Sequence, residues 1–166
     1  MMKRIQILKK EMEQEAQTTR KFLSLVPKEK FDWQPHPKSM TLMRLATHIA
    51  ELPGWVPMIL NTKELDFATG AYQPKEVADN KELMDFFEEK LIEGQKALSG
   101  EKEDDLELPW TLRNGEEVYE TSLKSEFIRT TFSQIVHHRA QLGVYLRLLD
   151  IPIPGSYGPS ADDQSF

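Results

Sequence analysis

Two histidines of the chain have the spacing expected of side chains that point into a helical core. His48 and His138 each have apolar residues three positions before them and four, seven and eleven positions after them: Leu45, Leu52, Trp55 and Ile59 around His48, and Ile135, Leu142, Tyr145 and Leu149 around His138. Residues at these spacings share one face of an α-helix, so both imidazoles are expected to meet in the interior. A buried imidazole needs a hydrogen-bond partner or a metal ion, because losing water without either is costly.

The neighbours of His138 bear on which of these two roles applies. Gln134 lies one helical turn earlier and is expected to point inward beside it. His137 lies about 100° around the helix, on its shoulder. A single histidine on an apolar face is usually a hydrogen-bonded core residue, whereas two that converge beside an inward glutamine fit a metal site equally well. Both interpretations stay open.

The composition restricts the classes of partner. The 166 residues hold 21 basic and 27 acidic side chains, and the net charge of −6 argues against a nucleic-acid partner. The chain has no cysteine, which excludes disulfides, a thiolate nucleophile and a thiolate metal site. No stretch is long and apolar enough for a membrane span, and "MMKRIQILKK" continues into polar residues, so we expect a cytoplasmic protein.

Four segments with helical periodicity must position the histidines: residues 2–25, 39–61, 80–98 and 122–149. Ser39 is the expected N-cap of the second segment. Pro53 and Pro57 are expected to kink or break it partway, because proline lacks a backbone donor. Asp79 or Asn80 is the expected cap of the third segment.

Between the third and fourth segments, Asn114-Gly115 is a strong signal for the turn of a short two-stranded β-hairpin. Four helices with long connections predict an all-α four-helix bundle with this hairpin inserted before its last helix. The length fits one domain over residues 1–166.

Three stretches resemble the DinB-like family: "FDWQPHPKSMTL", "LMRLATHIAELPGWV" and "HHRAQLGVYLRLLDIPIPGSYGPSADD". The resemblance covers essentially the whole chain in the order of its elements, and "HHRAQ" and "YGPSAD" are its specific parts. It implies a four-helix bundle of up-down-down-up order that is often a homodimer. It also implies a metal centre that takes one histidine from the second helix and two, four residues apart, from the fourth.

The metal ligands carry over only in part. His48 matches the histidine of the second helix and His138 the one before arginine, but Gln134 stands where the family usually has histidine. A neutral amide oxygen is a poorer ligand for zinc or nickel than an imidazole. Three arrangements stay open: His48, Gln134 and His138 with a water, a site that recruits His137, or a site that has lost its divalent metal.

The family resemblance implies a thiol-dependent transferase or isomerase that acts on a small electrophile. With no cysteine in the chain, the thiol must be a low-molecular-weight cosubstrate. The alternative is a non-catalytic bundle with a degenerate metal site that binds a small ligand or a stress-response partner.

Several other residues have a structural and a functional interpretation. Glu51 is more simply a solvated surface charge than a carboxylate that orients an imidazole. Arg139 is expected to pair with an acidic side chain or with the C-terminal segment, where Asp162 and Asp163 are candidates. Three aromatic residues, Trp33, Trp55 and Tyr157, are more simply packing residues than the lining of a pocket.

Overall fold

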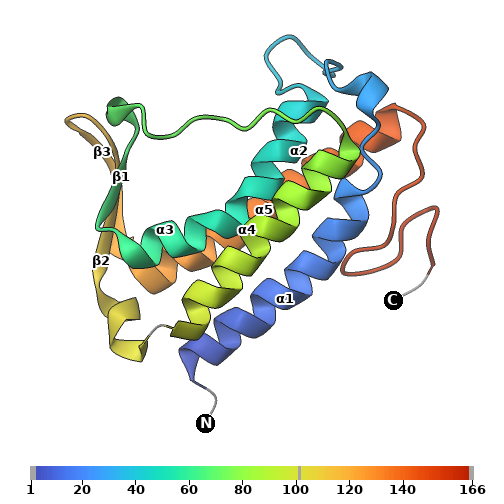
Figure 1. The fold of residues 1–166 in the computed structure, drawn as a ribbon. Coiled ribbons are helices and arrows are strands. Elements are labelled where there is room, and N and C mark those ends of the chain that lie inside the picture. The colour runs from blue at the N-terminus through green and yellow to red at the C-terminus, as the bar shows by residue number, and fades with distance from the viewer. Residues whose placement is uncertain (1–2, 101, 165–166) are drawn as a thin grey trace.

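Long helices confirm the helical periodicity of the sequence. The computed structural model describes residues 3–100 and 102–164, so Met2, at the predicted start of the first helix, lies outside the described residues. The helices are α1 (Arg4–Leu23), α2 (Leu42–Glu51), α3 (Trp55–Asn61), α4 (Asn80–Gly100) and α5 (Lys124–Leu148). α4 and α5 each pack against α1 on one side and against α2 and α3 on the other (Figure 1).

The second helical segment is interrupted where prolines predicted it. α2 ends at Glu51, a 3-10 turn spans Leu52–Gly54, and α3 then continues the segment. The predicted N-cap at Ser39 is wrong: Thr41 caps α2, and its Oγ1 accepts a hydrogen bond of 3.2 Å from the amide of Arg44. Ser39 instead closes a turn, because its amide donates to the carbonyl of His36 at 2.8 Å.

The start of α4 is fixed by two side chains. Asp79 is the cap, since its Oδ1 accepts a hydrogen bond of 2.9 Å from the amide of Glu82. Asn80 donates its side-chain amide to the carbonyls of Leu23 and Val26 at 2.8 and 3.0 Å. These bonds tie the beginning of α4 to the end of α1.

A small sheet stands at the end of the bundle where α5 begins (Figure 1). β2 (Pro109–Asn114) and β3 (Glu117–Leu123) form the predicted antiparallel hairpin, and Gly115 has the positive φ of 62° that its turn requires. The predicted strand number is wrong, because β1 (Glu64–Asp66) pairs parallel to β2 and makes a mixed three-stranded sheet. Oδ1 of Asp66 accepts a hydrogen bond of 2.9 Å from the amide of Gly115, which ties β1 to the hairpin turn.

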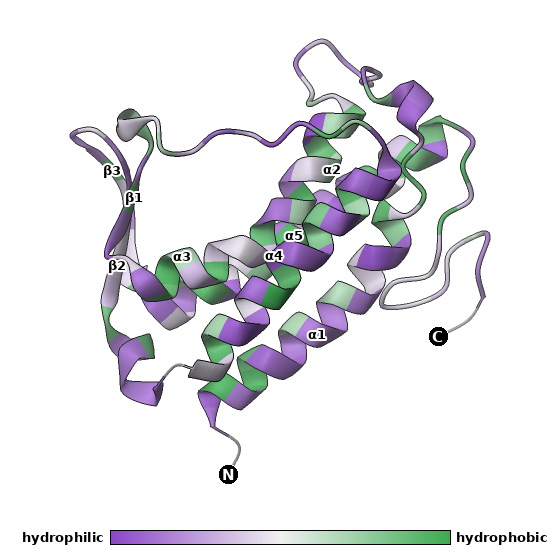
Figure 2. Cartoon of the chain, viewed as in Figure 1, coloured by the Kyte–Doolittle hydropathy of each residue, from purple (hydrophilic) through white to green (hydrophobic). Residues whose placement is uncertain are grey.

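Hydrophobic and hydrophilic residues alternate along each helix in Figure 2, and the buried hydrophobic residues form one core cluster. The apolar stripes around both histidines are buried, with exposed fractions of 0% for Leu45, 1% for Leu52, 4% for Ile135 and 0% for Leu142. This confirms that both histidines lie beside the core. None of the described helices combines the length and the apolar character that crossing a membrane requires.

Candidate functional site

The imidazoles of His48 and His138 face each other between α2 and α5. Their ring centroids are 4.6 Å apart and the ring planes meet edge to face at 78°. The side chain of His48 is 14% exposed, and His138 is half-buried. The two helices therefore bring together the pair that the sequence predicted.

Glu51 orients the ring of His48. Its Oε1 lies 2.6 Å from Nδ1 of His48, and the residue is only 8% exposed, so its interpretation as a solvated surface charge is wrong. A carboxylate only accepts hydrogen bonds, and Nδ1 of His48 therefore carries the proton. Nε2 is therefore the nitrogen that a neutral His48 offers to a ligand.

Arg44 and Tyr72 hold this carboxylate in turn. The hydroxyl of Tyr72 donates to Oε1 of Glu51 at 2.5 Å and accepts a bond of 2.7 Å from Nη2 of Arg44. Burial and the hydrogen bond to Glu51 raise the pKa of Tyr72 to about 12, so the phenol keeps its proton and stays a donor. The rings of Trp55 and Phe67 pack edge-on against Tyr72.

Arg44 and Tyr72 were not among the residues predicted for the site. For Arg44 a signal was present, because Arg44, His48 and Glu51 stand at i, i+4 and i+7 and share one face of α2. Tyr72 lies in the irregular segment between β1 and α4, where no periodicity indicates its direction.

Gln141 connects His138 to His137. Its Oε1 lies 3.3 Å from Nδ1 of His138, and its Nε2 lies 3.0 Å from Nε2 of His137. The pKa of His138 is lowered, first by burial and then by the nearby charges of His48, His137 and Arg44. His138 is therefore neutral at pH 7, with a lone pair on Nε2.

Gln134 is exposed rather than turned inward beside His138. The buried stripe of α5 passes through Ile135, Arg139 and Leu142, so its centre is rotated away from Gln134. Among the described residues, no three His, Cys, Asp or Glu side chains are grouped so that they could hold a metal ion. A metal site of His48, Gln134 and His138 stays a prediction.

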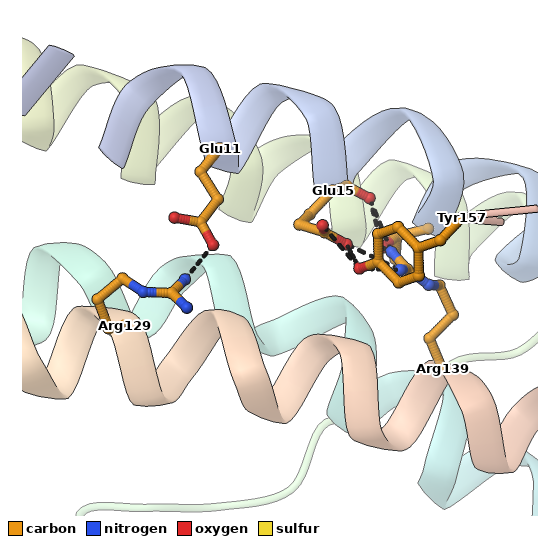
Figure 3. A network of polar contacts seen from close by, with 6 residues as sticks. Glu11, Glu15, Arg129, Arg139 and Tyr157 are labelled. Carbon is orange, nitrogen blue, oxygen red and sulfur yellow. Dashed lines mark hydrogen bonds and ion pairs between the residues drawn. The ribbon is translucent and has the colours of Figure 1, made fainter. Parts of the chain in front are cut away.

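Arg139 occupies the interior because the chain supplies partners from two distant segments (Figure 3). The residue is 2% exposed; its Nη2 pairs with Oε2 of Glu15 at 2.8 Å, and its Nη1 donates to Oγ1 of Thr19 at 3.0 Å. Tyr157, from the segment after α5, accepts from Nη2 at 2.9 Å and donates to Glu15 at 2.7 Å. This confirms that Arg139 pairs with an acidic side chain and shows that it also bonds to the C-terminal segment. The candidate Asp162 is wrong, because Asp162 pairs with Arg147 and the acidic partner of Arg139 is Glu15.

His137 borders a cavity that His138 does not line. It lines a cavity of about 330 Å³ between α1 and α5, together with Glu11, Arg129 and Tyr157. Figure 3 shows these three partners around the same stretch of α1 and α5, with the ion pair of Glu11 and Arg129 beside the Arg139 network. The ring of His137 also meets that of His138 edge to face, at a centroid distance of 4.8 Å, so a site that recruits His137 stays a prediction.

A larger cavity of about 670 Å³ is lined in part by Glu51. This volume suits a small ligand. Its lining includes Glu51, Gly54, Trp55, Tyr72, Phe86 and Lys90. Trp55 therefore lines a pocket, whereas Trp33 packs against Tyr145 at a centroid distance of 5.5 Å. Glu51 contacts His48 and also borders this cavity.

Comparisons with known proteins agree on the fold. The family model of the DinB family matches residues 1–164. A DinB-like protein of Bacillus cereus is 24% identical with a TM-score of 0.63, over 85% of this chain and 89% of that one. A DinB-like protein of Bacillus subtilis is 13% identical with a TM-score of 0.71, over 90% and 97%.

The chain is also similar to a mycothiol-dependent maleylpyruvate isomerase, at 16% identity and a TM-score of 0.61 over 86% of this chain and 64% of that one. At these identities the likeness shows the fold alone. No curated protein matches the sequence.

Proposed function

Because the chain belongs to the DinB family, we propose that its histidine pair is the centre of a thiol-dependent transferase or isomerase that acts on a small electrophile. The observation that carries the proposal is the convergence of His48 and His138 beside a buried carboxylate, at 4.6 Å between ring centroids. The isomerase of similar fold, which depends on mycothiol, supports a thiol as cosubstrate. The chain has no cysteine to provide one itself.

The proposal includes a divalent metal, zinc or nickel, held by His48 and His138 with Gln134 as third protein ligand. The donors fit in part: both histidines make their Nδ1 hydrogen bonds within the protein and so can offer Nε2 to an ion, and Glu51 makes the carboxylate contact that metal-binding histidines usually have. Gln134 must turn inward from its exposed position. When bound, such an ion lowers the pKa of a water or thiol or polarises a carbonyl.

The residues around the pair act by fixing and orienting it. Glu51 holds the Nδ1 proton of His48, and Tyr72 and Arg44 hold Glu51. Gln141 orients the ring of His138, which burial keeps neutral. The resemblance to the family further supports an up-down-down-up helix order, one domain over residues 1–166 and a homodimer.

A second candidate function is a non-catalytic bundle that binds a small ligand or a stress-response partner. The exposure of Gln134 favours it, because the described residues then offer the ion two imidazoles and no third grouped donor. The cavity bordered by Glu51 and Tyr72 is the expected ligand site in that case.

The deciding experiment is elemental analysis of tag-free protein after dialysis against zinc or nickel. We expect roughly one ion per chain in the parent, as in a typical protein zinc site, and its loss in His48→Ala and His138→Ala. His36→Ala is the matched control, since His36 is exposed in the loop before α2. Gln134→Ala reports whether the amide contributes.

The outcomes separate the two functions. Metal in the parent and in the His36 variant, but not in the two site variants, supports the enzyme and justifies assays with thiols. A parent that stays metal-free, or one whose metal is unaffected by both site variants, contradicts the proposed centre. A metal-free parent directs attention to the second candidate.

A further inference from the structure

Arg44 has an unused hydrogen-bond donor next to the histidine pair. Its Nη2 donates to the hydroxyl of Tyr72, but its Nη1 is buried and has no hydrogen-bond acceptor among the described residues. Oε1 of Glu51 lies 3.8 Å from Nη1, which is beyond hydrogen-bond distance. Buried donors without an acceptor are rare in native proteins and call for a specific explanation.

Glu51 does not satisfy the charge of Arg44 by itself. Its Oε1 already accepts from Nδ1 of His48 at 2.6 Å and from Tyr72 at 2.5 Å. One carboxylate is therefore shared by a guanidinium, a phenol and an imidazole.

Arg113 provides a contrast within the same chain. Its Nε also lacks a hydrogen bond among the described residues, but two carboxylates flank its guanidinium. Glu64 and Asp66 approach it to 3.7 and 3.3 Å. These two carboxylates of the sheet compensate the charge of Arg113. Arg44 has one carboxylate near it among the described residues, Glu51, and that contact is longer, at 3.8 Å.

The position of Arg44 places it within reach of the reacting centre. It precedes His48 by one helical turn on the same face of α2, a spacing at which side chains are neighbours. Its side chain is 27% exposed as a whole although Nη1 is buried, so an anion reaches Nη1 only when the guanidinium turns toward the solvent. A guanidinium presents two parallel N–H groups that match the two oxygens of a carboxylate.

We propose that Arg44 forms an anion subsite beside the histidine pair, and that the small molecule that binds there carries a carboxylate. The inference rests on the proposed function for its location and names the substrate class of the same site. Arg44 is a specificity-determining residue in this arrangement, since it selects the charged group while the histidines face the rest of the molecule.

The test uses the full chain freed of metal by a chelator and then desalted, because the chelator is itself a polycarboxylate. Succinate and its uncharged diamide, succinamide, are titrated at low ionic strength while the imidazole signals of His48 and His138 are followed by NMR. We expect saturable shifts with succinate and binding of succinamide about tenfold to hundredfold weaker, the range for losing a charged hydrogen-bond partner. Added salt is expected to weaken succinate binding.

Variants locate the subsite. Arg44→Met should weaken succinate binding by a similar factor, and Arg44→Lys should restore part of it, since lysine keeps the charge but not the paired donors. Arg113→Met is the matched control and should bind succinate like the parent. The comparison of succinate with succinamide uses the parent protein alone, so it shows whether the site prefers a carboxylate even if a variant fails to fold.

Equal binding of succinate and succinamide, or parent-like succinate binding by folded Arg44→Met, overturns the inference. The elemental analysis is independent of it. If succinate binding depends on Arg44 and no metal binds, the subsite stands and the proposed centre falls. If metal binds but succinate has no preference over its diamide, the proposed centre stands and the subsite falls.

Discussion

Replacing Glu51 by glutamine tests whether a buried carboxylate organises the site. The side chain keeps its size, but the bonds from His48 and Tyr72 lose their charged acceptor and Arg44 loses its counter-charge. A hydrogen bond to a charged group contributes about 1.5–3 kcal/mol. The amide oxygen keeps a weaker bond to one donor, so we expect the free energy of unfolding to fall by about 2–3 kcal/mol.

The same change should disorder the ring of His48. Its Nδ1 proton loses the partner that fixes it, and removing such a partner typically lowers metal affinity about 10–100-fold. Urea unfolding followed by circular dichroism measures the stability, and calorimetric titration with zinc measures the affinity. Glu76→Gln is the control, because Glu76 is exposed and borders the same cavity; its change should stay within about 0.5 kcal/mol.

Two results refute the reasoning. If Glu51→Gln unfolds within about 0.5 kcal/mol of the parent, the network around the carboxylate does not stabilise the fold. If stability falls but the zinc affinity is unchanged, Glu51 stabilises the helix pair without orienting the imidazole.

Two further predictions concern α5. In the metal-free protein, NMR titration should give His138 a pKa below its ordinary 6.5, and His48→Ala should raise it toward that value. As the pH falls, the unfolded chain binds a proton at His138 before the folded chain does. The contribution of His138 to stability is therefore complete above about pH 6.5 and is lost as the pH falls through the folded-state pKa. A folded-state pKa at or above 6.5 contradicts the prediction. Glu15→Gln should cost about 3 kcal/mol in urea unfolding, because Arg139 is 2% exposed and loses the one carboxylate that pairs with it among the described residues. Tyr157→Phe removes the bonds of an exposed hydroxyl to Arg139 and to Glu15 and should cost about 1 kcal/mol; equal costs contradict the assignment.

Periodicity was a good guide to the helices and to the histidine pair. The apolar neighbours of His48 and His138 report which helix face is buried, and that information is local in the sequence. Gln134 was placed wrongly because the buried stripe of α5 is centred nearer Arg139. A charged residue is buried in a core only when it has partners. The partner of Arg139 on α1 is Glu15, which lies 124 positions away in the sequence, so the pattern around Arg139 does not indicate it.

The missed elements share this dependence on distant partners. β1 has three residues and pairs with β2, in register from Glu64 with Thr111, so its extended form comes from the neighbouring strand rather than from its own alternation. Tyr72 contacts Arg44 and Glu51 from a segment without regular structure. The N-cap of α2 depends partly on local sequence and partly on the surrounding chain. Both Ser39 and Thr41 are suitable N-cap residues, but Ser39 takes part in a turn with His36, so Thr41 caps the helix.

The charges of the cluster bear on both proposals at once. Arg44 carries a positive charge and Glu51 a negative one, while Tyr72 keeps its proton and His138 is neutral, so the charges of these four residues balance when nothing is bound. Near neutrality allows such a cluster to lie at the edge of a core, since unpaired buried charge is costly. A cation at the histidines adds positive charge beside a guanidinium that is already short of a partner, and a carboxylate on Arg44 offsets part of it. Binding of each is therefore expected to favour binding of the other, by the same factor in both directions.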